Sequence, residues 1–211
     1  METRKPRRPA IIEPETLEYL EGEEDPALSS ESAHTSARIL VKSPNGEWSD
    51  PDPKTKERLL KHMQDNGVDE LAELWSRSPV NTLPGVLWRL LLIDQWVKRY
   101  PEGVNTRFKQ GLNSPRLSEH LDIEGAHSLD FPGWKKQLGQ ILGGSFEGNF
   151  ADFLDTSQAV LRVLAASESV WMKENPQDML ANAVTLRDNA LLATADELLD
   201  AATMYREGRL D

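Results

Sequence analysis

One stretch of the sequence, residues 83–100, constrains the fold more than any other part of the chain. Apolar side chains recur along it at helical spacing and also cover most of the remaining helical surface: Val86, Leu87, Trp88, Leu90, Leu91, Leu92, Ile93, Trp96, Val97 and Tyr100. A helix that is apolar nearly all round is a buried helix. Arg89 and Asp94 interrupt it, and it is shorter than the roughly 20 apolar residues of a membrane span. We therefore expect this helix in the middle of a bundle, with partners on several sides.

Start and stop signals for helices recur from residue 52 to the end of the chain. Asp52, Thr82, Asp130 and Asn149 are good N-caps, the first three with a proline in the following turn. The expected helices cover residues 53–66, 69–78, 82–100, 102–110, 131–143, 150–171, 177–192 and 195–207, the last with a capping box at 194–197. No stretch alternates with a period of two for long enough to build a sheet. We predict an all-α fold, a single bundle of about seven helices in residues 51–211, with a long connection at 112–130.

The first 50 residues differ from the rest, and we expect them to form a disordered charged tail. Residues 1–52 carry a net charge of −6 and the remainder −5, within a total of −11. The tail holds a basic tip at 4–8, an acidic run at 13–25 and a small polar stretch at 29–36. Such a composition buries too little apolar surface to offset the entropy of ordering. Two parts could order on contact: the apolar positions between Ile11 and Leu20 are typical of a segment that docks into a partner's groove, and residues 37–41 have strand-like propensity, although a solvated tail is the commoner outcome.

Composition removes several classes of protein. The chain has no Cys, so disulfide scaffolds, thiolate nucleophiles and Cys-ligated metals are excluded. It has no stretch that could span a membrane, and no apolar signal core follows the basic N-terminal residues. We therefore predict a cytoplasmic protein that does not associate with a membrane. The net charge of −11 makes nucleic acid an unlikely partner, since Lys and Arg supply most of the affinity for phosphates. The basic tip, Arg4, Lys5, Arg7 and Arg8, is the one local exception.

No motif predicts catalysis. His120 and His127, with acids between them, are the densest set of metal ligands, but their spacing matches neither a zinc-protease helix nor a calcium-binding loop, and we predict no metal. The glycines at 139–144 end a helix and no Lys follows, so they indicate a turn and not a phosphate cradle. No Ser lies in a Gly-x-Ser-x-Gly elbow. We predict no catalytic residues and no cofactor, and we lean against an enzyme.

The strongest candidate for a binding surface is the Trp- and Arg-containing region at 74–89. Its candidate partner-binding residues are Trp75, Arg77, Thr82, Trp88 and Arg89. Free backbone N–H groups at a helix start beside Arg would suit a carboxylate or phosphate, and Trp offers a large, rigid contact area. The alternative is structural: Trp at helical spacing usually belongs to a core, and Arg89 could pair with Asp94 or Glu73. The sequence leaves open whether Trp75, Trp88 and Trp96 are core or surface.

The string LAELWSRSPVNTLPGVLWRLLLIDQWVKRYPEGV and the closing MYREGRLD resemble a family of small actinobacterial proteins to which no activity is firmly assigned. The resemblance covers roughly residues 55–211. It implies an all-helical fold and supplies no catalytic residues.

Three functions are consistent with these observations. The first is a non-catalytic helical interaction or regulatory protein, which binds a protein partner through the Trp/Arg surface or the charged tail. The second is a nucleic-acid-associated regulator that uses the basic tip. The third is an enzyme that binds a small molecule, an anion or a nucleoside, between the 112–130 connection and the helix at 82–100, with His120, His127 or Arg89 in its pocket. A homodimer is compatible with all three.

Overall fold

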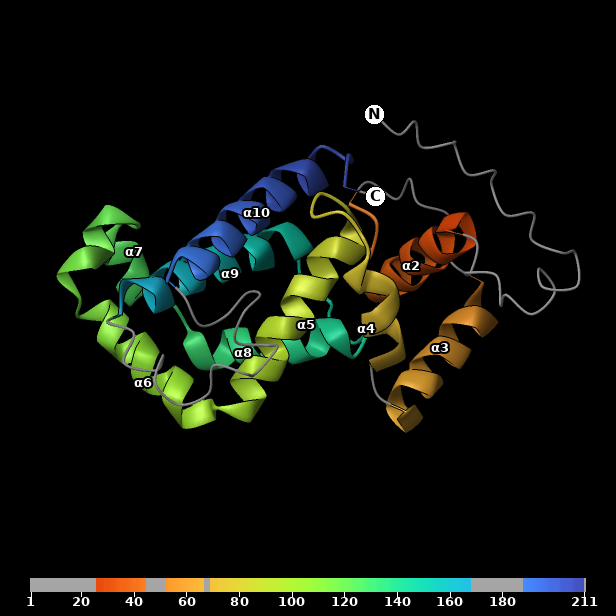
Figure 1. Cartoon of the computed structure of the whole chain (residues 1–211), viewed down its shortest axis with the longest axis horizontal. Coiled ribbons are helices and arrows are strands. Elements are labelled where there is room, and N and C mark those ends of the chain that lie inside the picture. Colours follow the sequence, from red (N-terminus) through yellow and green to blue (C-terminus); the bar gives the residue numbers. More distant parts are fainter. Residues whose placement is uncertain (1–25, 45–51, 67–68, 168–187, 211) are drawn as a thin grey trace, which may run out of the picture.

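The structure is a computed structural model and describes residues 26–44, 52–66, 69–167 and 188–210 (Figure 1). Within these ranges it contains nine α-helices, one short 3-10 helix and no strand, so the predicted all-α fold is confirmed. In chain order the elements are α2 (Pro26–Leu40), α3 (Pro53–Asn66), α4 (Asp69–Ser76), α5 (Leu83–Arg99), α6 (Pro101–Leu112), the 3-10 helix η1 (Pro115–Glu119), α7 (Ile123–His127), α8 (Phe131–Leu142), α9 (Phe150–Ala166) and α10 (Asp188–Arg206).

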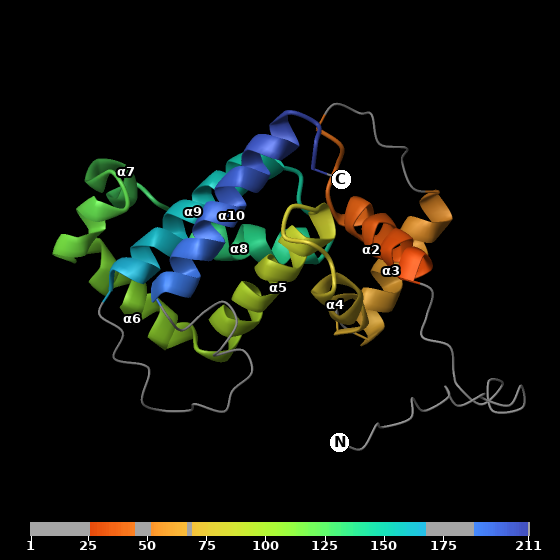
Figure 2. The ribbon, with the colours of Figure 1, turned by 45° about the horizontal axis from the view of Figure 1, so that its top comes forward.

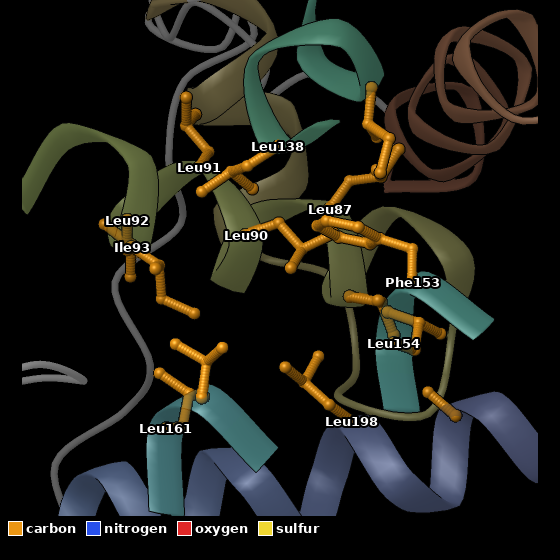
Figure 3. Close-up of a cluster of buried hydrophobic side chains, with 14 of the residues drawn as sticks. Leu87, Leu90, Leu91, Leu92, Ile93, Leu138, Phe153, Leu154, Leu161 and Leu198 are labelled. Atoms are coloured by element: carbon orange, nitrogen blue, oxygen red, sulfur yellow. The ribbon is translucent and has the colours of Figure 1, made fainter. Parts of the chain in front are cut away.

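The apolar helix α5 runs through the middle of the molecule, as the sequence predicts. The hydroxyl of Thr82 accepts a hydrogen bond from the Gly85 N–H at 3.3 Å, and Pro84 occupies the first turn. The helix ends at Arg99, with Tyr100 as its C-cap just before Pro101. In Figure 3 the leucines of α5 interlock with side chains from α8, α9 and α10: Leu87, Leu90, Leu91, Leu138, Phe153, Leu154, Leu161 and Leu198. This cluster is the centre of the hydrophobic core.

The long helices α9 and α10 lie side by side along their length, in both Figure 1 and Figure 2. They are antiparallel, because Arg206 at the end of α10 contacts Asp152 at the start of α9. Helix α8 packs against the pair through Trp134, whose indole N–H donates to the Ser157 hydroxyl at 2.8 Å. Helix α6 approaches α9 so closely that a Cβ on Gly111 would lie 1.8 Å from the Val163 carbonyl oxygen. Small and polar residues therefore set the spacing of this half of the bundle.

The expectation that the first 50 residues form a disordered tail is wrong for the part that the structure describes. Residues 26–40 form helix α2, and Ala33, Ala37 and Leu40 are buried on one of its faces. That face packs against α4 and α5. Alanines give a strong helical preference but a weak apolar signal, and the polar residues between them obscure the pattern. The strand-like segment at 37–41 is likewise helical to Leu40, while residues 1–25 and 45–50 lie outside the described residues.

The C-terminal prediction of two helices divided by a capping box is also wrong where it can be tested. Helix α10 continues unbroken through Thr194, whose hydroxyl donates to the Ala190 carbonyl at 2.9 Å. Thr194 is buried, so tertiary packing overrides its preference for a cap. The predicted stop at Gly208 is confirmed by its φ of 68°. Residues 177–187 and Trp171 lie outside the described residues.

The predicted connection at 112–130 contains short helical elements of its own. Helix α6 extends through Gly111 to Leu112, η1 and α7 follow, and Leu117 and Ala126 are buried against the bundle. Asp130 caps α8 and Asn149 caps α9, both as predicted. Helix α9 ends at Ala166, before the predicted end at residue 171.

Candidate functional site

The structure places the tryptophans of the predicted binding surface mainly in the core. Trp75 is 0% exposed, and its indole N–H donates to the Ser36 hydroxyl at 3.1 Å. Trp96 is buried as well, and Trp88 is half-buried against the core cluster. Thr82 acts as the N-cap of α5. The sequence left open whether these tryptophans belong to the core or to the surface. In the structure Trp75 and Trp96 belong to the core, and Trp88 packs against it.

The two arginines of that surface, Arg77 and Arg89, have different partners and exposure. Arg89 forms an ion pair with Glu197 of α10 and donates from Nη1 to the Gly85 carbonyl at 3.0 Å. It therefore ties α5 to α10, and it pairs with neither Asp94 nor Glu73. Arg77 lies at the exposed end of α4, 3.9 Å from Glu73. The five candidate residues do not share one exposed face, because Trp75 offers no surface to a partner.

The histidines of the 112–130 segment do not assemble a metal site with the residues around them. His127 is exposed, and His120 is half-buried with its Nε2 atom shielded from solvent and without a hydrogen-bond partner. Within the described ranges no three His, Cys, Asp or Glu side chains are grouped so that they could hold a metal ion. The basic tip, Arg4, Lys5, Arg7 and Arg8, lies outside these ranges.

A buried arginine that the sequence analysis missed joins four elements. Arg107 of α6 is 1% exposed and donates from Nε to the Leu164 carbonyl at 2.9 Å and to the Ser167 hydroxyl at 3.0 Å. Its Nη2 donates to Asp188 at 3.0 Å, and Arg116 of η1 reaches the other oxygen of that carboxylate at 3.2 Å. Burial lowers the pKa of the Arg107 guanidinium, while the carboxylate of Asp188 acts in the opposite direction. These partners all belong to the bundle itself. The network therefore connects α6 to the end of α9 and to the start of α10.

An open apolar groove lies at the other end of the molecule, where α2, α3 and α4 meet (Figure 2). We call it the α2–α4 groove. Its volume is about 380 Å³, and its lining residues are Leu28, Glu31, Ser32, Thr35, Ser36, Ile39, Thr55, Leu59, Leu71 and Leu74. Helix α2 supplies six of these at three- and four-residue spacing, which is one continuous face of the helix. Helix α2 thus has two working faces, one buried against α4 and α5 and one that lines the groove.

The groove is apolar at its base and hydroxylated along its edge. Ile39 and Leu71 are buried, Leu74 is half-buried, and Leu28 at the mouth is 62% exposed. The buried indole of Trp75 donates a hydrogen bond to the Ser36 hydroxyl, and this contact links the groove to the core. The groove therefore has a buried apolar base, and the large apolar side chain of Leu28 is open to solvent at its mouth. Exposed leucines in isolation are ordinary, but one at the mouth of an apolar groove marks a surface that can bury more area.

Helix α3 gives one wall of the groove a positive charge. Over residues 53–61 it carries Lys54, Lys56, Arg58 and Lys61 against a single acid, Glu57, and all five side chains are exposed. At about 100° per residue, Lys56 and Arg58 flank the groove-facing stripe on either side, whereas Glu57 lies on the opposite face of the helix. Beyond α3, Glu73 of α4 pairs with Arg77, and Glu31 of α2 is the one acid among the lining residues. The α2–α4 groove therefore favours an occupant that brings apolar side chains and acids together.

Sequence reasoning missed this groove because it assigned α2 to the tail. The sequence signal was weak: Ala33, Ala37 and Leu40 recur at helical spacing, but four of the six α2 residues that line the groove are polar. In comparisons with protein-family models, with curated proteins and with solved structures, nothing matches this chain. The resemblance to an actinobacterial family stays a prediction. None of the helices in the described ranges is long and apolar enough to cross a membrane.

Proposed function

We propose that this protein is a non-catalytic interaction protein whose α2–α4 groove binds a segment of a partner protein in which apolar side chains alternate with acids. The observation that carries the proposal is the open apolar groove directly beside the cationic wall of α3. Apolar contacts supply affinity in such a site, and charge complementarity supplies selectivity and speed of association. The Trp/Arg region then acts as the support of the groove through Trp75 and Ser36.

The dimensions of the groove suit a short peptide segment. The stripe from Leu28 to Ile39 on α2 is about 16 Å long at 1.5 Å per helical residue. That length matches about five residues of extended chain or three turns of a helix. The hydroxyls of Ser32, Thr35 and Thr55 along the edge can pair with a peptide backbone. A segment with two or three leucine-sized anchors would fill it.

The chemistry of the lining argues against catalysis at this site. Glu31 is the one ionisable residue among those that line the groove. General acid–base chemistry usually needs a second titratable group or a metal within reach, and the lining supplies neither. His120, His127 and Arg89 are not among the lining residues, so the groove is not the small-molecule pocket of the third hypothesis. We assign the binding to the cytoplasm, on the composition arguments above.

Titration of the full-length chain with a pair of labelled peptides tests the proposal. The acidic peptide has leucine, isoleucine and tyrosine at its apolar positions and glutamate elsewhere; its companion has lysine in place of every glutamate. We expect saturable binding of the acidic peptide, followed by fluorescence anisotropy, and none of the basic one. The double variant Lys56→Glu/Arg58→Glu should weaken that binding by roughly tenfold, because two attractive contacts become repulsive. Salt should weaken it as well.

The matched control is the double variant Lys54→Glu/Lys61→Glu. It changes the net charge by the same amount on the same helix, but both positions point away from the groove. Thr35→Trp, an exposed position, should fill the groove and abolish binding without affecting the core. Equal losses in the two charge-reversed variants, or unchanged binding in Thr35→Trp, would show that the peptide binds elsewhere. Failure of the acidic peptide to bind any full-length variant would overturn the proposal.

A further inference from the structure

We infer that the α2–α4 groove is occupied in the free protein by a segment of the same chain, residues 11–20, which a partner must displace. The inference rests on the function proposed above and adds its regulation. It commits to one occupant, and three observations support that choice: the chemistry of the segment, its distance from the groove along the chain, and the charge of α3.

Residues 11–20 have the composition that the groove favours. The segment IIEPETLEYL carries five large apolar side chains, Ile11, Ile12, Leu17, Tyr19 and Leu20, between three glutamates. Four more acids follow at 21–25, and the first basic residue after Arg8 is Arg38. The acids of the segment are therefore not neutralised by their neighbours in sequence. Lys56 and Arg58, on the two sides of the stripe of α3 that faces the groove, can neutralise them.

The segment is attached where it can reach the groove. Five residues lie between Leu20 and Pro26, the first residue of α2, and the connection spans at most about 20 Å. Leu28 and Glu31, at the near end of the groove, belong to the first two turns of α2. With Gly22 in the connection, the segment can turn back along α2 toward Ser36. Glu31 repels acids on the α2 side, which directs the glutamates of the segment toward α3.

The tether makes even a weak contact effective. A connection this short gives the attached segment an effective concentration on the order of 1 mM at its site. Docking with a dissociation constant of about 0.1–0.5 mM would occupy roughly two thirds to nine tenths of the grooves without help from any other interface. A partner segment in solution must then compete, so its apparent affinity equals its intrinsic affinity multiplied by the fraction of grooves that is free.

Disulfide trapping in the full-length chain tests the location directly. The protein has no Cys, so no native thiol competes with the two that are introduced. We compare Leu17→Cys/Ser32→Cys, which pairs the segment with the groove, and Leu17→Cys/Glu57→Cys, which pairs it with the opposite face of α3. Both target positions are exposed. Under mild oxidation the first pair should form an intramolecular disulfide at least about tenfold faster, and excess acidic peptide should slow it.

Equal rates for the two pairs would overturn the inference, and so would a disulfide that forms mainly between two chains, which would make the occupant a second copy of the protein. The second arm is peptide binding by Leu17→Ser/Leu20→Ser, with the exposed Leu199→Ser as control. We expect the first variant to bind the acidic peptide roughly threefold to tenfold more tightly than the unaltered chain and the control to bind it equally.

The two arms separate this inference from the proposed function. If the peptide binds in a manner that depends on Lys56 and Arg58, but Leu17→Ser/Leu20→Ser leaves its affinity unchanged, internal docking is wrong and the proposed function holds. If the disulfide forms selectively with Ser32→Cys and no acidic peptide binds either chain, the groove serves the protein's own segment and the proposed function is wrong.

Discussion

The two ends of this bundle are built differently. On one side α5, α8, α9 and α10 enclose a continuous core, in which Leu87, Leu138, Leu161 and Leu198 are each 0% exposed (Figure 3). On the other side α2, α3 and α4 form a thinner layer. Of the α3 side chains from residue 53 to residue 61, none is buried, and Leu59 and Leu60 are half-buried. On the core side these leucines are fully buried. In the layer, some apolar surface is not fully covered by any described part of the chain.

The difference between the two sides gives one chain both a stable core and an open surface. Helix α2 belongs to both sides, since Ala33 and Ala37 face the core while Thr35 and Ile39 line the groove. Helix α3 is attached through Leu60, which lies against Gly144, a residue with a φ of 67°. Regions with few buried apolar contacts open at low free energy. The layer is thus the part of the molecule best suited to admit another segment.

The largest expected effect tests whether the core side depends on its buried ion pair. Arg107→Ala removes a fully buried side chain that donates hydrogen bonds to Asp188, Leu164 and Ser167. We expect it to lower the free energy of unfolding by about 3–5 kcal/mol, because it leaves a cavity and breaks these hydrogen bonds, although Asp188 keeps its contact with Arg116. Urea denaturation followed by circular dichroism measures the change. Arg116→Ala is the control: its side chain is 41% exposed, so it should cost less than about 1 kcal/mol. Similar losses in both variants would contradict the special role of Arg107.

The next prediction compares one leucine from each side. Leu161→Ala leaves a cavity in the fully packed core and should destabilise the protein by about 2–5 kcal/mol. Leu59→Ala removes a half-buried side chain from α3 and should cost less than about 1 kcal/mol, since water already reaches the site. Hydrogen exchange of the amides in α3 and α9 provides a second measurement. Exchange that is equally slow in the two helices would remove the distinction between the two sides.

A pair of glycines sharpens the contrast within the core side. Gly111→Ala places a methyl group 1.8 Å from the Val163 carbonyl oxygen and should destabilise the protein by about 1–3 kcal/mol, because α6 and α9 must separate. At Gly139 in α8 an added Cβ meets nothing within 4 Å. Gly139→Ala should therefore stabilise the protein by about 0.5–1 kcal/mol through its higher helical preference. The two melting temperatures should move in opposite directions; a shift in the same direction would show that the α6–α9 approach can relax.

The elements that sequence analysis predicted correctly are those with local signals. Thr82 and Pro84 at the start of α5, Asp130 and Pro132 at the start of α8, and Asn149 before α9 act through neighbouring atoms. Their geometry is set within one turn of helix, so it can be read without knowledge of the rest of the fold.

The errors concern residues whose role depends on distant parts of the chain. Thr194 has the pattern of a cap, yet it is buried in the middle of α10 because α9 packs along that helix. Arg107 resembles any exposed cation of an amphipathic helix, and its burial depends on Asp188, which lies 81 residues further along the chain. The α2–α4 groove requires α2, α3 and α4 to meet in space, and no single segment carries that information.

The smallest effect concerns a hydrogen bond that links α10 to the end of α2. The hydroxyl of Tyr205, near the end of α10, donates to the Lys42 carbonyl just after α2 at 2.6 Å. Tyr205→Phe removes this hydrogen bond and should lower the free energy of unfolding by about 0.5–1.5 kcal/mol. Amides of α2 should exchange faster in the variant, while those in the middle of α9 should not. Unchanged exchange in α2 would show that the layer is held by its apolar face alone.

The same residue makes this contact sensitive to alkaline pH. Burial raises the pKa of the Tyr205 hydroxyl in the folded protein, because the phenolate would lose solvation. The unfolded chain therefore releases this proton first, and the stability contributed by Tyr205 is fully present below about pH 10 and declines above it. We expect the difference in unfolding free energy between the unaltered chain and Tyr205→Phe to shrink as the pH rises from 9 to 11. The two proteins share every lysine, so the general titration of lysines over the same range cancels in this difference; a difference that stays constant from pH 9 to 11 would contradict the prediction.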